Sequence, residues 1–430
     1  MIKTFAAGVA LGALMFAAGA QAQDKPAELR IGISTFLSGS ASVFGEPAKQ
    51  AADMFVEEIN KSGGILGVPV KVTYIDEGAG TEQLTTEYKR LAQDKTDVFF
   101  SAISSGNCNK IAPLAEDLKV INFMWDCGTQ QIFEQGKYRY VFRTQANATP
   151  EVLAPLLYLL KAKPNFKTIA VVNQDYAWGR DSWAIFSAAL KKLKPDVQIV
   201  AEMFPKFGAP DYSTEVSRLL ALRPDVILST SWGGDLDTFV RQASQRGLMR
   251  NSTFVLSLAE SSLQRIGKDL PDGVIVGGRG DHYFLHPETR DDPKMKAFVE
   301  AFKTKTGAYP IYPVFHMAQA FSALQAVYKK ASDANGGKFP NKEQIADAMK
   351  GLTFKAFGRP ITIRDDNQGV EDQLIGVTKK VAAYPFPVID DMMIFPSAKM
   401  MPAVGQTSEA WIATLTPDLV NIKADSFKHR

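Results

Sequence analysis

The feature that most constrains the fold is an alternation of short apolar runs with amphipathic stretches, which begins at Leu29. The apolar runs have the length of buried strands, and the stretches between them repeat their apolar residues with a helical period. This rhythm is typical of a parallel sheet covered by helices on both faces. The expected strands are 29–34, 70–75, 98–101 and 120–124, and the expected helices are 47–60, 82–93 and 111–118.

The same rhythm starts again after residue 167. The expected strands are 168–173, 197–203, 226–230 and 253–257, and the expected helices are 179–193, 212–222 and 235–246. Two successive units of this kind predict an α/β protein with two lobes, each with its own sheet. The length of 430 residues supports two lobes, because one hydrophobic core rarely serves so long a chain.

The last third of the chain has a weaker pattern. We expect helices at 292–306 and 314–331, and strands at 361–364 and 373–380 on either side of an Asp-Asp-Asn-Gln-Gly turn. Residues 385–430 contain many turn-forming residues and little apolar periodicity. They are therefore expected to form a loosely specified tail packed on the second lobe.

The first 22 residues are typical of a secretory signal peptide. Lys3 is followed by an apolar stretch from Phe5 to Ala18 and by Ala20-Gln21-Ala22, a small-x-small sequence that a signal peptidase accepts. The alternative, a membrane anchor, is disfavoured because a bilayer span needs about 20 apolar residues. No cysteine follows the expected cleavage point, so a lipid anchor there is not expected. The mature chain is expected to be exported.

The charge of the chain is nearly balanced, with a formal net charge of +3 at pH 7. Lysines and arginines are scattered rather than clustered. We therefore expect no binding to nucleic acid and no electrostatic attraction to an anionic membrane.

The chain has two cysteines, Cys108 and Cys127, each just beyond a predicted strand. In an oxidising compartment an even count favours a disulfide. Two buried thiols or a metal-binding pair are the alternatives. A zinc site would need further ligands, and the four histidines do not obviously supply them.

Polar and aromatic residues directly follow the predicted strands, where ligands of open parallel sheets bind. In the first unit these residues are mainly small and hydroxyl-bearing, including Ser104 and Ser105. In the second unit they include Trp178, Trp232 and Glu260. This division predicts that one lobe holds a carboxylate with hydroxyls and backbone N–H groups while the other covers the ligand with aromatic surface. Alternatively, a serine only caps the next helix and the tryptophans only pack.

Two segments resemble the type I periplasmic solute-binding proteins of the leucine/isoleucine/valine-binding kind. The first is LSGSASVFGEPAKQAADMFVEEINKSGGILGVPVKVTYIDEG at 37–78, and the second is RPDVILSTSWGGDLDTFVRQASQRGL at 223–248. The resemblance covers roughly residues 29–380. It implies two Rossmann-like lobes joined by three crossings, with residues 29–144 and 281–358 in lobe 1 and 145–280 and 359–430 in lobe 2.

By its position in this family, the chain is expected to work in the periplasm as a monomer that delivers its ligand to the permease subunits of an ABC importer. The resemblance places Ser105, with Ser104, and Thr129 at a ligand carboxylate. Phe44 flanks the ligand, and Glu260 corresponds to the acid that receives its ammonium group. Trp178 and Trp232 stand where the family often has tyrosines. Asp126 stands where the family tends to have small or hydroxyl residues, and it completes the set of candidate ligand-binding residues.

No enzyme motif is present: the chain has no G-x-S-x-G elbow, H-E-x-x-H pair or phosphate-binding P-loop. His282 and His286 lie in a predicted strand or loop, where residues four apart do not meet, and we expect no metal there. The acidic turn at 365–369 lacks the glutamate of a calcium loop. His316 is expected to touch the cleft or to pack in the core. No catalytic residue and no cofactor are expected.

These observations predict a binding protein that closes its two lobes on a small carboxylate-bearing ligand. The ligand would be an amino acid, branched-chain or aromatic, or an aromatic acid, and the wide faces of the tryptophans favour a bulky or aromatic one. A periplasmic sensor that reports to a membrane receptor is the alternative, and a hydrolase is less expected.

Overall fold

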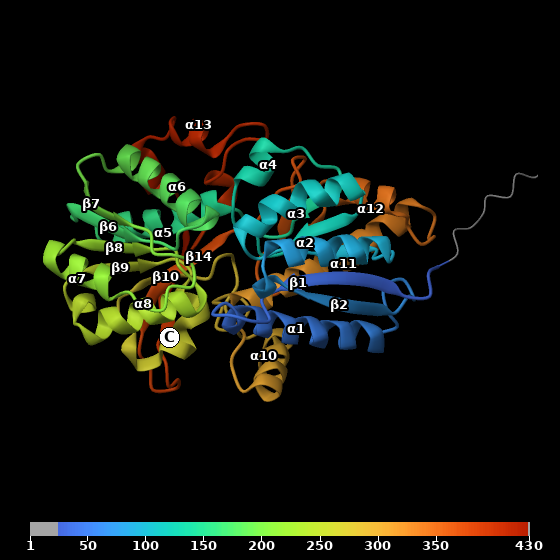
Figure 1. The fold of residues 1–430 in the computed structure, drawn as a ribbon, viewed down its shortest axis with the longest axis horizontal. Coiled ribbons are helices and arrows are strands. Elements are labelled where there is room, and N and C mark those ends of the chain that lie inside the picture. The colour runs from blue at the N-terminus through green and yellow to red at the C-terminus, as the bar shows by residue number, and fades with distance from the viewer. Residues whose placement is uncertain (1–24, 429–430) are drawn as a thin grey trace, which may run out of the picture.

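The computed structural model describes residues 25–428, so the expected signal peptide at 1–22 lies outside the described residues. The described chain forms two α/β lobes that lie side by side, each built around its own sheet (Figure 1). Within this part of the chain, no helix combines the length and the apolar character that crossing a membrane requires.

The sheet of lobe 1 has five parallel strands in the order β2-β1-β3-β4-β5. They are β1 (Leu29–Thr35), β2 (Val70–Asp76), β3 (Val98–Phe100), β4 (Ile121–Met124) and β5 (Val141–Arg143). Successive side chains of β3 point to opposite faces, as the pleat of a strand requires. Phe99 stacks on Tyr88 of α2, whereas Phe100 packs against Phe321 of α11. Helices therefore cover both faces of this sheet.

Among residues 25–428, seven helices belong to lobe 1. They are α1 (Ser42–Lys61), α2 (Thr81–Gln93), α3 (Ser105–Leu118), α4 (Gln131–Gln135), α10 (Pro293–Thr306), α11 (Tyr312–Ala334) and α12 (Lys342–Met349). The last three come from late in the sequence and return to the N-terminal lobe, as the orange ribbons in Figure 1 show.

The sheet of lobe 2 has the order β16-β15-β14-β10-β9-β8-β6-β7. Its parallel strands are β6 (Thr168–Val172), β7 (Gln198–Met203), β8 (Val226–Ser229), β9 (Thr253–Leu256) and β10 (Ile275–Gly277). Three antiparallel strands extend it: β14 (Gln373–Lys379), β15 (Val388–Phe395) and β16 (Asp425–Phe427). Its helices are α5 (Ala148–Ala162), α6 (Ala177–Leu193), α7 (Ser213–Leu222), α8 (Gly233–Gln245), α9 (Leu263–Ile266) and α13 (Ser408–Ile412).

The chain passes between the lobes three times: after β5, after β10 and before β14. A small antiparallel sheet of β11 (Thr353–Phe354), β12 (Ile361–Ile363) and β13 (Gly369–Val370) lies in the third passage. The expected fold, two Rossmann-like lobes joined by a three-crossing hinge, is confirmed.

Two expectations for the C-terminal region were wrong. The turn at 365–369 does join two antiparallel strands, but its partners are β12 and β13, whereas β14 belongs to the large sheet. Residues 385–430 are not a loose tail, because β15 pairs with β14 along its length and β16 pairs with β15. The alternation of buried and exposed residues in β15 is broken by buried neighbours at both ends, which conceals the strand in the sequence.

Candidate ligand-binding site

A small cavity lies between the lobes, at the carboxyl ends of the parallel strands. Four of the sequence-predicted residues line it: Ser105, Asp126, Trp178 and Trp232. The other lining residues are Ile103, Tyr176, Leu258 and Arg279. The cavity leaves about 10 Å³, room for about one water molecule. A ligand larger than water can therefore enter only when the lobes are farther apart.

Lobe 1 contributes the N-terminal turn of α3 and the loop after β4. Ser104 is the N-cap residue of α3, without a side-chain capping bond, and its N–H donates to Glu77 Oε2 at 3.3 Å. Ser105 Oγ accepts the N–H of Thr129 at 3.2 Å, so it links the helix start to the loop. The disulfide between Cys108 and Cys127 joins the same two segments, which confirms the predicted bridge.

Lobe 2 contributes aromatic side chains whose polar ends are fixed. The Trp178 Nε1–H donates to the carbonyl oxygen of Thr230 at 2.8 Å, and the Trp232 Nε1–H donates to Tyr176 Oη at 2.5 Å. With both indole N–H groups occupied, the rings are held in place. Phe44 of α1 does not line the cavity but packs edge-on against Trp232, with ring centroids 5.1 Å apart.

Arg279 is the buried cation of the cavity, and it was not among the residues predicted from the sequence. Arg279 follows β10, and the candidate ligand-binding residues were those that directly follow predicted strands. Recognition of this short strand in the sequence would therefore have identified Arg279 as well. Its Nη1 lies 2.9 Å from Asp126 Oδ2 and its Nε lies 3.1 Å from Glu151 Oε2. The guanidinium carbon lies 5.1 Å from the centre of the Trp178 ring. Burial raises the pKa of Asp126 and of Glu151 to about 7 in each case, although Arg279 favours their charged forms.

Gly128 makes this packing possible. A Cβ atom at this position would lie 2.4 Å from two ring atoms of Trp178 and 2.8 Å from Arg279 Nη2. Any other residue would therefore push the loop of lobe 1 away from the aromatic and cationic groups of the cavity.

Thr129 and Glu260 lie beside the cavity and have other partners. The Thr129 hydroxyl donates to Asp181 Oδ2 of α6 at 2.6 Å. Glu260 Oε2 accepts the backbone N–H of Tyr312 at 2.8 Å, and burial raises the pKa of Glu260 to about 8. The ligand contacts expected of these two residues, of Ser104 and of Phe44 stay predictions, as do those of the four predicted residues that line the cavity.

The two lobes touch on both sides of the cavity. On one side Thr129 and Gln131 both donate to Asp181. On the other side the Ser40 hydroxyl donates to Asp235 Oδ1 at 3.2 Å, and the Gly234 N–H donates to the carbonyl oxygen of Ser40. The structure thus has the lobes closed over the cavity.

Glu371 connects the three crossings of the hinge. Its carboxylate accepts the N–H of Ala146 in the first crossing, the N–H of Asp281 in the second and the Gln319 side chain of α11, and Glu371 itself lies in the third. His282 Nε2 is 3.7 Å from its Oε1.

His282, His316 and Glu371 are close enough to be considered as metal ligands, with one possible ligand atom each within 4.8 Å of the others. Both nitrogens of His316 are already occupied, by Asp126 and by the carbonyl oxygen of Arg279. His286 does not belong to this group of three, and its Nε2 lies 2.8 Å from Asp281 Oδ1.

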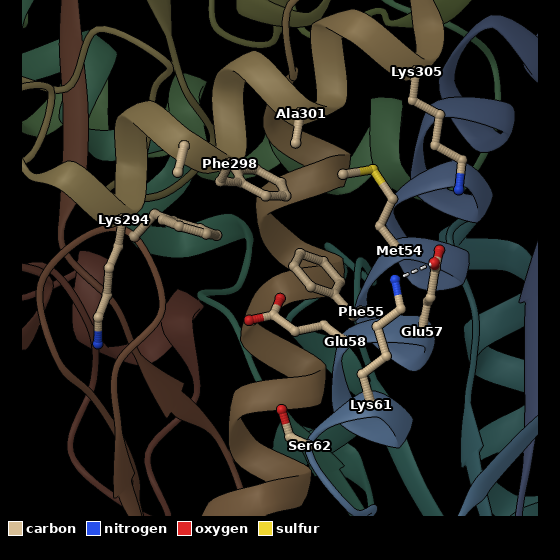
Figure 2. Close-up of a pocket in the computed structure, with 12 residues that line it drawn as sticks. Met54, Phe55, Glu57, Glu58, Lys61, Ser62, Lys294, Phe298, Ala301 and Lys305 are labelled. Atoms are coloured by element: carbon tan, nitrogen blue, oxygen red, sulfur yellow. Dashed lines mark hydrogen bonds and ion pairs between the residues drawn. The ribbon is translucent and has the colours of Figure 1, made fainter.

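A second cavity of about 700 Å³ is a groove on the outside of lobe 1 between α1 and α10 (Figure 2). Phe55, Phe298 and Met54 form its apolar floor, and lysines and glutamates form its rim. Met54 is ten residues beyond Phe44 on α1, about 15 Å along the helix. The groove lies within one lobe, so a ligand there would not be enclosed by closure of the lobes.

Comparison with known proteins also indicates a binding protein. Residues 28–380 match the model of a family described as periplasmic binding protein. A leucine-, isoleucine-, valine-, threonine-, and alanine-binding protein of Pseudomonas aeruginosa is 22% identical over 330 residues, which cover 76% of this chain and 83% of the relative.

Two of the solved structures that share the fold are described as solute-binding proteins. A solute-binding protein of an ABC transporter from Rhodopseudomonas palustris BisB5, in complex with 3,4-dihydroxy benzoic acid, has a TM-score of 0.73 and 22% identity and covers 86% of this chain and 98% of its own. A second one from R. palustris, in complex with benzoate, has a TM-score of 0.70 and 18% identity and covers 84% and 95%. The family match over most of the chain shows that this protein belongs to the periplasmic binding protein family.

Proposed function

We propose that this protein captures a small aromatic carboxylate between its two lobes. The observation that carries the proposal is the pairing of a buried cation, Arg279, with the faces of Trp178 and Trp232 in one interlobe cavity. An aromatic acid offers one negative group and one flat apolar body, and the cavity offers a partner for each. Ser105 adds a hydroxyl at the start of α3, where N–H groups favour negative charge.

An amino acid fits this cavity less well, because its ammonium group needs a negatively charged partner. Glu260, the acid expected for that role, faces the Tyr312 N–H and does not line the cavity. Asp126 does line it, but this carboxyl already contacts Arg279 and His316. Two neighbours in fold were crystallised with benzoic acids, in agreement with the proposal.

We also propose that the signal peptide at 1–22 is removed on export and that the mature protein works in the periplasm as a monomer. Closure would present a ligand-loaded surface from both lobes to the permease subunits of an ABC importer. We favour this role over a receptor-bound sensor because the neighbours in fold are described as ABC transporter solute-binding proteins. We take the lobe boundaries to be those predicted, 29–144 with 281–358 and 145–280 with 359–430.

The ligand class can be tested by thermal unfolding and calorimetry with benzoate, 4-hydroxybenzoate, phenylalanine, leucine and benzamide. Benzamide has the shape of benzoate without its charge, so it tests the cation directly. We expect the two benzoates to raise the midpoint of unfolding and benzamide to have little effect. Stabilisation by leucine or phenylalanine without any response to the benzoates would refute the proposed ligand class.

The site itself can be tested with Ser105→Ala and Trp232→Ala. Each is expected to lower benzoate affinity by about tenfold or more, since each removes one contact worth about 1.5 kcal/mol. Ser187→Ala, at a partly exposed position of α6, is a matched control. Unchanged affinity in both cavity variants would remove the site assignment.

A further inference from the structure

The carboxyl group of Asp126 lies between a cation and a histidine. Its Oδ2 is 2.9 Å from Arg279 Nη1, and its Oδ1 is hydrogen-bonded to Nδ1 of His316. The other nitrogen of the same ring, Nε2, lies 2.8 Å from the carbonyl oxygen of Arg279. All three residues are buried: Asp126 and His316 are fully buried and Arg279 is 6% exposed.

These contacts determine where the protons are. A carbonyl oxygen can only accept a hydrogen bond, so Nε2 of His316 must carry a hydrogen. In a neutral imidazole the other nitrogen, Nδ1, is then an acceptor. The hydrogen between Nδ1 and Asp126 must therefore belong to the carboxyl group, or the ring must be an imidazolium. In both cases the Asp126–His316 pair holds one proton more than a carboxylate and a neutral histidine would.

We propose that Asp126 and His316 share one buried proton and that this proton neutralises the Asp126 carboxyl group, so that Arg279 attracts an anionic ligand. With the pair neutral, Glu151 is the one other acid among the described residues whose carboxyl group contacts the guanidinium. An ionised Asp126 beside a neutral His316 would instead add a negative charge beside Arg279, and this charge would oppose a carboxylate. His316 does not line the cavity, so it would determine specificity through Asp126. This inference rests on the proposed anionic ligand.

Charged and titratable groups face the pair from every element packed against it. Arg279 and His282 come from the second crossing, Glu151 from α5, Tyr312 from α11 and Tyr176 from the N-cap of α6. Burial raises the pKa of Asp126 to about 7, and burial together with Arg279 lowers the pKa of His316 well below its ordinary value. Both directions favour a protonated carboxyl group beside a neutral ring.

The proton can be located without any ligand by NMR of the full chain with ¹⁵N-labelled histidine. The His316 ring signals are assigned by their loss in His316→Phe. We expect the neutral Nε2–H form between about pH 5.5 and pH 6.5, below the raised pKa of Asp126. An imidazolium would also support the shared proton. A neutral ring that carries its hydrogen on Nδ1 would overturn the proposal, because Asp126 would then be an ionised acceptor.

The effect on specificity can be tested with a double-mutant cycle, using benzoate as the probe. His316→Phe removes the nitrogen that accepts the proton and favours the ionised form of Asp126 beside Arg279. We expect it to weaken benzoate binding by about tenfold or more when residue 126 is Asp, and by less than about threefold in the Asp126→Asn background, where residue 126 cannot ionise. Equal losses in both backgrounds, or no loss in the first, would overturn the proposal.

The two proposals can fail separately. If benzoate does not bind the unmodified protein, the proposed ligand class fails, and the NMR measurement still decides whether the proton is shared. If benzoate binds but His316 carries its hydrogen on Nδ1, the ligand class stands and the shared proton does not.

Discussion

The hydroxyl of Thr129 in lobe 1 donates a hydrogen bond of 2.6 Å to the Asp181 carboxylate in lobe 2. This contact exists only when the lobes are closed, so it contributes to the closed state and not to the stability of either lobe.

Thr129→Val should therefore shift the protein towards open forms. Valine keeps the shape of threonine and removes the hydroxyl, which leaves Asp181 with one donor fewer and costs about 1 kcal/mol in the closed state. We expect a larger radius of gyration in small-angle X-ray scattering and a loss of ligand affinity of about threefold to tenfold. Thr86→Val, at an exposed position of α2, is the matched control. Unchanged scattering and affinity for Thr129→Val would show that this bond does not influence closure.

Gly128→Ala should damage the cavity through steric contact alone. The new Cβ would lie 2.4 Å from ring atoms of Trp178, so the ring or the loop must move, at a cost of about 1–3 kcal/mol. We expect weaker ligand binding and a changed tryptophan fluorescence spectrum. Gly106→Ala in α3 is the control, since its Cβ meets nothing closer than Ser104 Oγ at 3.7 Å. Equal behaviour of the two variants would contradict the close packing at Gly128.

The parallel strands of both lobes other than β5 and β10 could be predicted from the sequence, because their apolar runs are short and are separated by amphipathic helices. Ser105, Asp126, Trp178 and Trp232 could be predicted to lie together because each follows a parallel strand, and the carboxyl ends of parallel strands meet at one edge of a sheet. Arg279 was missed because β10 has only three residues and was not recognised as a strand.

Helix α5 was missed for a different reason. Thirteen of its fifteen residues are buried, including Pro150 and Pro155, so the helix shows no amphipathic period. Two prolines in such a run also argue against a helix in the sequence. Because the helix was not predicted, its Glu151, which contacts Arg279, was not predicted as a site residue either. Strand β14 was predicted at 373–380, but its pairing with β10 joins segments that are far apart in the chain, and no local pattern indicates such a pairing.

The disulfide should support both stability and binding. Cys108 and Cys127 are 19 residues apart, and closing a loop of this size stabilises a fold by about 3 kcal/mol in the chain-entropy model. The double variant Cys108→Ala/Cys127→Ala should lower the free energy of unfolding by about that amount. The bridge also fixes Ser105 relative to the loop of Asp126. We therefore expect the double variant to lose ligand affinity as well, by less in free energy than it loses in stability. Denaturant unfolding and calorimetry, with the reduced protein for comparison, would measure both, and equal stability with and without the bridge would contradict this prediction.

Glu260 should make the protein less stable as the pH rises. Burial raises its pKa to about 8 in the folded protein, whereas an unfolded glutamate titrates near about pH 4.3. Between these values the folded state holds a proton that the unfolded state has released, so the free energy of unfolding falls as the pH rises through this window. Asp126, Glu151 and Glu371, whose pKa values are also raised, act in the same direction.

Glu260→Gln replaces this carboxyl group with a neutral side chain that can still accept the Tyr312 N–H. Between about pH 5 and pH 8 the free energy of unfolding of the variant should fall less steeply than that of the unmodified protein, by about 1.4 kcal/mol for each unit of pH. Glu409→Gln, at an exposed position of α13, is the matched control and should leave the slope unchanged. Denaturant unfolding at several pH values measures the difference, and parallel curves for all three proteins would show that Glu260 is not the titrating group.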